Sequence, residues 1–234
     1  MDIKSKIILI AGPTASGKTK FAVQLAKKIN GEIINADSMQ IYKEFKILTA
    51  RPSIKDKKNV KHHLYGFLSV KKNFSTGQWL KLVKKKIKEI RERKKTPILV
   101  GGTGLYFKSL TDGLVKIPHI PISFRKKIRL LQKKLGQKKF FTKLKKIDPI
   151  YVSQIKPTDI QRSIRGYEVK FYTKKSLIEW FNETKPIFDK NSFMKLYINY
   201  PRKELIERIS KRSEQMVKEG VAKEVKKFLT IKVK

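Results

Sequence analysis

Short apolar runs alternate with segments of helical periodicity along the N-terminal half of the chain. Four of these runs have the length of strands buried inside a parallel sheet. They cover residues 6–11, 32–36, 63–70 and 97–100. Between them, residues 18–29 and 79–93 carry apolar side chains three and four positions apart, which predicts amphipathic helices. Strands that alternate with helices predict an α/β fold built on a parallel sheet.

The pattern changes after Gly113. From residue 115 to about 191 the chain shows helical spacing, repeated prolines and no convincing buried strand. An apolar run at 194–199 then returns to strand character, and an amphipathic helix is expected at 202–218. A strand that resumes after a helical stretch indicates an insertion. We therefore expect a core made of residues 1–114 and 192–234, interrupted by a helical lobe at 115–191.

The chain is strongly basic. Its 234 residues include 57 Lys and Arg against 19 Asp and Glu, which gives a formal net charge of +38. Such a charge favours association with a polyanion such as nucleic acid. A bias toward AT-rich codons is a second explanation, because only ten of the basic residues are Arg. The charge therefore supports an RNA partner without proving one.

Hydropathy and cysteine content narrow the class of protein. No segment approaches the ~18 consecutive apolar residues that a membrane span needs, so a soluble, cytoplasmic protein is expected. The sequence contains no Cys, which excludes a disulfide framework and thiolate-bound zinc.

The strongest local signal follows the first apolar run. It is a complete G-x-x-x-x-G-K-[ST] motif between a predicted strand and a predicted helix. Its residues are Gly12, Pro13, Thr14, Ala15, Ser16, Gly17, Lys18 and Thr19. The glycines let backbone N–H groups surround a phosphate, Lys18 adds a positive charge, and the Thr19 hydroxyl is suited to bind Mg²⁺. The motif predicts a di- or triphosphate site but does not choose the reaction, and a chance match in a glycine-rich turn is the alternative.

The second acidic residue of nucleotide hydrolases is missing. Switch and motor NTPases carry it at the end of a buried strand, whereas residues 97–100 lead here into Gly101, Gly102 and Thr103. The acid at a strand end is instead Asp37, where open α/β sheets place residues that contact ligands. Asp37 is a candidate to meet the hydroxyl of a kinase substrate or the amine of a prenyl acceptor. Its alternative role is to cap a helix that begins at Ser38.

Six motifs, read in order, resemble the tRNA dimethylallyltransferases. They are GPTASGKT at 12–19, NADSMQIY at 35–42, LTARP at 48–52, HHLYG at 62–66, VGGTGLYFKSLTDGL at 100–114 and DIQRSIRGYEV at 159–169. The resemblance covers almost the whole chain, and the first, second and fifth motifs together are highly specific. It implies a P-loop NTPase-like core of parallel strands, with a helical insertion that grips the anticodon arm of tRNA.

The same resemblance implies a reaction. In that family the loop holds the diphosphate of dimethylallyl diphosphate and does not bind ATP for hydrolysis. Mg²⁺ is the cofactor expected for this chain. The dimethylallyl group passes to N6 of the adenosine beside the third anticodon base, in tRNAs that read codons beginning with U. Asp37 matches the catalytic carboxylate, and Lys18 and Thr103 are further catalytic candidates. The implied tRNA contacts are Asp37, Ser38, Met39, Gln40, Thr103, Arg125, Gln161, Arg162, Ser163, Ile164 and Arg165.

The end of the chain departs from this family. Its members continue beyond the helix predicted at 202–218 through a G-Y-[KR]-[QE] segment and a basic helix, whereas Phe228 is followed here by Leu-Thr-Ile-Lys-Val-Lys. Because of this departure we expect weak binding to tRNA. We also expect the protein to be a monomer. Three alternatives stay open: a prenyltransferase of free adenine nucleotides, a P-loop small-molecule kinase and an inactive RNA-binding fragment.

Overall fold

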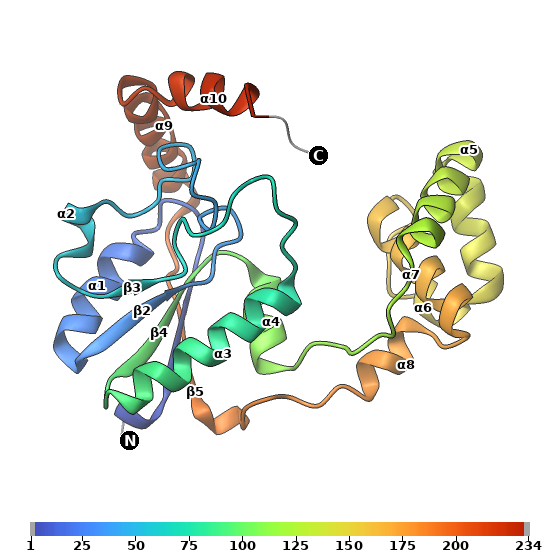
Figure 1. The fold of residues 1–234 in the computed structure, drawn as a ribbon, viewed down its shortest axis with the longest axis horizontal. Helices are drawn as coiled ribbons and strands as arrows, with labels where there is room; N and C mark the ends of the chain where they lie inside the picture. Colours follow the sequence, from blue (N-terminus) through green and yellow to red (C-terminus); the bar gives the residue numbers. More distant parts are fainter. Residues whose placement is uncertain (1–2, 232–234) are drawn as a thin grey trace. The chain divides into compact units, whose positions relative to one another are not determined.

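A parallel sheet of five strands forms the centre of the α/β part of the structure, a computed structural model that describes residues 3–231 (Figure 1). The strands are β1 (Ile7–Ala11), β2 (Gly31–Asn35), β3 (His62–His63), β4 (Thr96–Gly101) and β5 (Phe193–Tyr197). Their order across the sheet is β3-β2-β4-β1-β5, and all four neighbouring pairs run parallel. The predicted α/β fold is therefore confirmed.

Helices pack on the sheet through the apolar faces that the periodicity indicated. The helices of this part of the structure are α1 (Lys18–Ile29), α2 (Ile54–Lys57), α3 (Thr76–Glu92), α4 (Gly104–Thr111), α9 (Arg202–Lys218) and α10 (Val221–Leu229), with 3-10 turns η1 (Ile3–Ser5) and η2 (Lys190–Ser192), and α1 and α3 are the ones that contact the sheet most. Helix α1 buries Ala22, Val23 and Ala26 in one cluster with apolar residues of β1, β2 and β4. Helix α3 begins with a capping box between Ser75 and Gln78. Helices α1 and α3 thus cover the sheet, while α9 contributes residues to the cavity at its carboxyl edge.

The strand predicted at 63–70 is mostly wrong. Only His62–His63 pairs with β2, opposite Ile33 and Ile34. Leu64 has a left-handed backbone with φ of 62°, and Gly66 has φ of 56°. Two such residues break an extended run, because L-residues in strands keep negative φ. The apolar residues that follow therefore belong to a loop.

The structure divides into two compact units, one formed by the residues before 112 and after 186 and the other by residues 112–186. From the sequence pattern, these boundaries were expected at 115 and 191. The second unit contains α5 (Ile122–Ile147), α6 (Pro149–Val152), α7 (Ile160–Thr173) and α8 (Leu177–Asn182), and no strand forms anywhere in 112–186. Helix α5 is kinked at Gly136, where φ is 70°.

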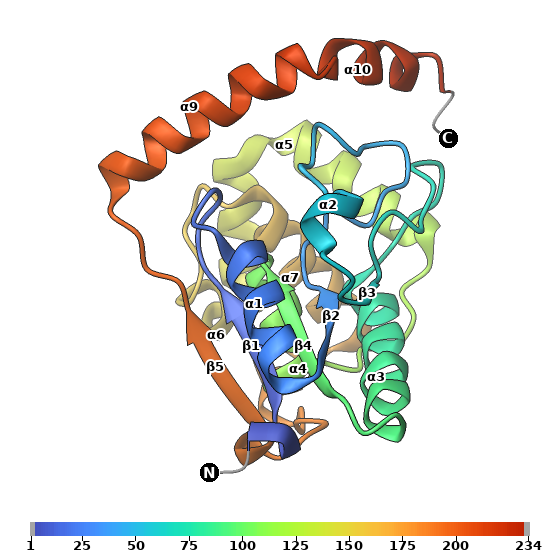
Figure 2. The same cartoon turned by 90° about the vertical axis from the view of Figure 1, so that its left-hand side faces the viewer.

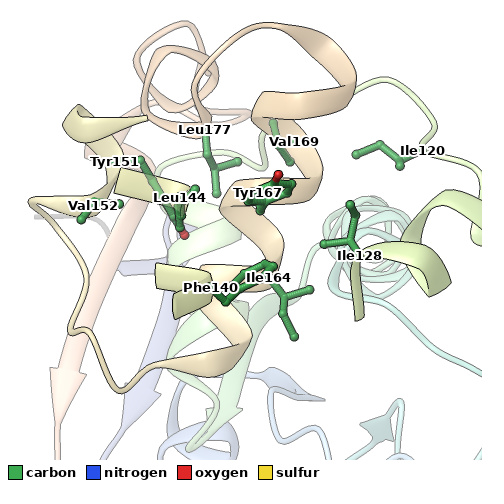
Figure 3. Packing of buried hydrophobic residues seen from close by; sticks show 10 residues of the cluster. All are labelled: Ile120, Ile128, Phe140, Leu144, Tyr151, Val152, Ile164, Tyr167, Val169 and Leu177. Carbon is green, nitrogen blue, oxygen red and sulfur yellow. The ribbon is translucent and has the colours of Figure 1, made fainter. Parts of the chain in front are cut away.

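The helical unit has its own apolar core. Figure 3 shows Phe140, Leu144, Ile164 and Tyr167 turned toward one another from α5 and α7. The Phe140 and Tyr167 rings lie 5.1 Å apart between their centroids. Of the helices within residues 3–231, none is both long and apolar enough to cross a membrane.

Candidate active site

The P-loop turns sharply between β1 and α1. Ala15 and Gly17 have left-handed backbones, with φ of 61° and 86°, a geometry that suits a loop whose N–H groups converge on an anion. The Lys18 ammonium group folds back and donates to the Pro13 carbonyl at 2.5 Å. Burial lowers the pKa of Lys18; the charge of Asp37 opposes this shift and that of Arg212 adds to it. The loop thus concentrates positive charge beside the carboxylate of Asp37.

A cavity of about 550 Å³ opens next to this loop. It is lined by Thr14, Ala15, Ser16, Gly17, Lys18, Thr19, Asp37, Met39, Gln40, Leu48, Thr49, Ala50, Tyr65, Val100, Gly101, Arg208 and Arg212. Six of the eight predicted P-loop residues and three of the four residues from Asp37 to Gln40 therefore share one cavity. Gly12 lies just behind it, where a Cβ atom would come within 2.8 Å of the Ile198 carbonyl oxygen.

Asp37 is held by its buried neighbour Asn35 at the end of β2. The Asn35 amide donates to the carbonyls of Asp37 at 2.9 Å and Leu64 at 3.1 Å, and its oxygen accepts the Asp37 N–H at 2.9 Å. The Trp79 indole N–H donates to the Asn35 carbonyl at 3.1 Å. The loop that carries Asp37 is therefore fixed to both β2 and α3.

Asp37 does not cap a helix, because no helix begins at Ser38. Its Oδ1 atom accepts the Met39 N–H at 2.8 Å, which makes a tight turn instead. Ser38 and Thr103 are outside the cavity lining and are bonded to each other, Ser38 N–H to Thr103 Oγ1 at 2.9 Å. Gln40 lines the cavity while its amide group donates to the carbonyls of Thr49 and Ala50 at 2.9 and 3.1 Å. Gln40 thus joins two walls of the cavity.

Two arginines of the cavity were not predicted from the sequence. Arg208 and Arg212 are four residues apart on α9, so they project from one face of the helix. Burial lowers the pKa of Arg212, and the charge of Asp37 opposes that shift. The spacing of the two arginines was a visible signal, but only the fold brings α9 to the P-loop.

The helical unit carries the other predicted RNA contacts. On α7, Gln161 and Arg162 are exposed and Arg165 is partly exposed, whereas Ser163 and Ile164 are buried. The Ser163 hydroxyl donates to the Asp159 carbonyl at 2.6 Å, and Ile164 belongs to the apolar core. Only the first three of these side chains are thus available to a partner of this unit. Arg125 of α5 is also partly exposed.

One acidic side chain binds two of these arginines. Glu168 is 1% exposed, and its Oε2 atom lies 3.3 Å from Arg125 Nε and 3.4 Å from Arg165 Nη1. Its Oε1 atom has no hydrogen-bond partner. The two arginine side chains are 42% and 40% exposed, so each pairs with Glu168 and is still partly open to solvent.

Comparison with known proteins finds a matching family model and similar sequences. A family model described as IPP transferase matches residues 40–234. The tRNA dimethylallyltransferase of Pelagibacter ubique is 59% identical over 234 residues, which is all of this chain and 75% of the relative.

The chain belongs to the IPP transferase family. The resemblance identified in the sequence is thereby confirmed. The family model begins at Gln40, so the P-loop and Asp37 lie outside it, but both lie inside the match to the Pelagibacter relative.

More distant IPP transferases are longer than this chain. The tRNA dimethylallyltransferase of Rickettsia massiliae is 44% identical over 95% of this chain, which spans 61% of that relative. A eukaryotic dimethylallyltransferase acting on tRNA has a structure that superposes with a TM-score of 0.82 at 30% identity, over 96% of this chain and 56% of the other. The tRNA isopentenylpyrophosphate transferase of Bacillus halodurans gives a TM-score of 0.64 at 33% identity, over 98% of this chain and 72% of the other.

Proposed function

We propose that this IPP transferase moves a dimethylallyl group from dimethylallyl diphosphate to N6 of the adenosine beside the third anticodon base, in tRNAs that read codons beginning with U. The observation that carries the proposal is the shared cavity of the P-loop, Asp37, Arg208 and Arg212. Asp37 is the one acid among the residues that line it. The positively charged residues can bind an anionic diphosphate, and the carboxylate beside them can accept a proton. This combination suits a transfer in which diphosphate leaves and a proton is removed.

Asp37 is the group to take that proton. The N6 amine of adenine is a weak nucleophile, because its lone pair is delocalised into the ring. As the new C–N bond forms, the amine nitrogen becomes acidic, and a carboxylate within hydrogen-bond reach accepts its proton. The hydrogen bonds around Asp37 support this role, because Asn35 fixes its backbone and the Met39 N–H fixes its carboxylate before substrate arrives.

The cations of the cavity serve the leaving group. When the C–O bond of the donor breaks, diphosphate takes the electron pair and gains negative charge. Lys18, Arg208 and Arg212 stabilise that charge more strongly in the transition state than in the bound donor. The N–H groups of the P-loop act in the same direction.

The residues present fit a magnesium ion that arrives with the donor. Mg²⁺ is commonly held by one or two protein oxygens together with phosphate oxygens and water. The Thr19 hydroxyl lines the cavity beside the P-loop and would hold the ion there. Bound Mg²⁺ would neutralise part of the diphosphate charge.

The proposed acceptor, a tRNA anticodon arm, fits the charge of the helical unit. Residues 112–186 contain 19 Lys and Arg against six Asp and Glu. A surface of this kind binds a phosphate backbone, whereas a free adenine nucleotide needs no such surface. The target base must leave its stack to reach a buried donor, and an unpaired loop base does so more easily than a duplex base.

Mass spectrometry of nucleosides tests the proposal directly. Unmodified tRNA is incubated with the protein, Mg²⁺ and dimethylallyl diphosphate, digested and analysed. We expect N6-dimethylallyladenosine from tRNA and none when the donor is replaced by ATP. Modification of free adenine nucleotides in place of tRNA, or release of ADP from ATP, would replace the proposal with one of the alternative reactions.

A further inference from the structure

Helices α9 and α10 form a C-terminal arm, residues 202–229, that passes over the carboxyl end of the sheet (Figures 1 and 2). The arm is weakly packed. Leu205 is the one buried residue of α9, and α10 has none among its described residues. Ile206 and Val217 on α9 are 56% and 67% exposed. Apolar burial therefore contributes little to the position of the arm.

Glu224 of α10 fastens the arm to the loop at residues 45–51. Its Oε1 atom accepts the N–H groups of Lys46 at 2.7 Å and Ile47 at 3.0 Å, and its Oε2 atom accepts the N–H of Leu48 at 2.8 Å. Hydrogen bonds to an ionised acceptor are stronger than those between neutral groups. Burial by itself would raise the pKa of Glu224, but these three N–H groups and the charge of Arg51 hold it below its usual value. The carboxylate is thus ionised at neutral pH.

An aromatic contact supports the same attachment. The Phe228 ring of α10 lies 4.8 Å from that of Phe45, measured between centroids, and Phe45 is 8% exposed. Phe228 is one helical turn beyond Glu224, so both side chains reach the loop from one face of α10.

The loop and the arm that this attachment joins both contribute residues to the cavity. The loop supplies Leu48, Thr49 and Ala50 to its lining, and α9 supplies Arg208 and Arg212. An arm that moves away from the loop would take the two arginines with it. It would also release the wall that Leu48 forms.

We propose that Glu224 is a positioning residue, which closes the C-terminal arm over the P-loop so that loop 45–51 and the α9 arginines bind the donor diphosphate together. The inference rests on the proposed function for the identity of the donor. It requires that the affinity of the cavity for an anion depends on the Glu224 attachment. If only the closed arm binds well, the apparent dissociation constant rises as the closed fraction falls.

The test uses inorganic pyrophosphate with Mg²⁺ as the probe, with binding measured by calorimetry on the full chain. In Glu224→Gln one carboxylate oxygen becomes an NH₂ group, which faces a backbone N–H instead of accepting from it. We expect pyrophosphate to bind roughly tenfold more weakly. In turnover, KM for dimethylallyl diphosphate should rise by a similar factor while kcat stays within about twofold. Glu219→Gln is the matched control, because Glu219 is exposed and accepts a hydrogen bond from Gln215 within the arm.

A double variant separates positioning from general destabilisation. In an Arg212→Ala background, the effect of Glu224→Gln on pyrophosphate binding should shrink, because the arm then delivers only Arg208 to the cavity. Phe228→Ala should reproduce the Glu224→Gln phenotype by loosening the same attachment. Unchanged pyrophosphate binding in Glu224→Gln, or an undiminished effect in the Arg212→Ala background, would overturn the inference. Coupling without any prenyl transfer by the parent chain would support the inference and contradict the proposed function.

Discussion

The backbone N–H of Ser38 donates a hydrogen bond of 2.9 Å to the Thr103 hydroxyl, which joins two motifs 65 residues apart. The Thr103 hydroxyl in turn donates to Ser38 Oγ at 3.3 Å, and the Thr103 N–H donates to the Ala36 carbonyl at 3.2 Å. Close approach of β4 to the end of β2 makes this contact possible. A Cβ atom on Gly101 would lie 2.1 Å from the Ala36 oxygen, so glycine is required there.

The Ser38 contact predicts a positioning role for Thr103, which a substitution can measure. Thr103→Val keeps the shape of the side chain and removes the hydroxyl, so the Ser38 N–H loses its partner. Loss of a hydrogen bond at this half-buried site costs about 0.5–1.5 kcal/mol, and we expect kcat to fall by up to roughly tenfold as the Asp37 loop loosens. Thr103→Ser keeps the hydroxyl and should stay within about twofold of the parent. A Thr103→Val enzyme with unchanged kcat would show that the contact does not position Asp37.

Replacement of Asp37 by Asn separates proton removal from donor binding. Loss of a general base typically lowers a rate by about 10²- to 10⁴-fold. Pyrophosphate should still protect Asp37→Asn from thermal unfolding, because Lys18, Arg208 and Arg212 remain in the cavity. The check is prenyl transfer measured beside thermal shifts with pyrophosphate and Mg²⁺. Transfer within threefold of the parent would remove Asp37 from the catalytic role.

The sequence predicted the parts of the site that lie in short contiguous motifs. The P-loop and Asp37 each follow an apolar strand, so the rule that ligands meet the carboxyl ends of parallel strands places them together. Arg212 escaped prediction because α9 reaches the P-loop only through the fold of the C-terminal arm. The extent of β3 was also mispredicted, since an apolar run does not reveal the left-handed backbone at Leu64.

Replacement of Glu168 should change the affinity for tRNA, and two explanations of its ion pairs predict changes in opposite directions. Glu168→Gln removes one negative charge from the unit, so general attraction to phosphate predicts slightly tighter tRNA binding. If Glu168 instead holds Arg125 and Arg165 ready for phosphates, binding should weaken by about fivefold to tenfold. The salt slope should also fall by roughly one contact, about 0.7–0.9. Affinity is measured by filter binding at several salt concentrations.

Glu183→Gln is the control for that experiment, since it removes the same charge at the C-cap of α8, where the Glu183 carboxylate pairs with Lys175 and with neither arginine. Equal and slightly tighter binding by both variants would mean that Glu168 only packs the core. Thermal unfolding of both proteins checks that the helical unit remains folded.

Glu32 predicts how the stability of the α/β unit depends on pH. This carboxylate is 1% exposed and pairs with His63 at 2.6 Å, Arg93 at 2.7 Å and Lys95 at 3.4 Å. Burial opposes ionisation, but the hydrogen bonds and charges of Arg93 and His63 lower the pKa of Glu32 to about 2, from 4.5. A carboxyl whose pKa is depressed by folding stabilises the native state above its unfolded pKa and loses that contribution as pH falls through the folded value. Unfolding free energy should therefore decline between about pH 4.5 and pH 2. The part due to Glu32 is the difference between the parent and Glu32→Gln in chemical denaturation, which should be constant above pH 5 and shrink below it. A difference that does not change across this range would mean that the ion pairs leave the pKa of Glu32 the same in the folded and unfolded chains.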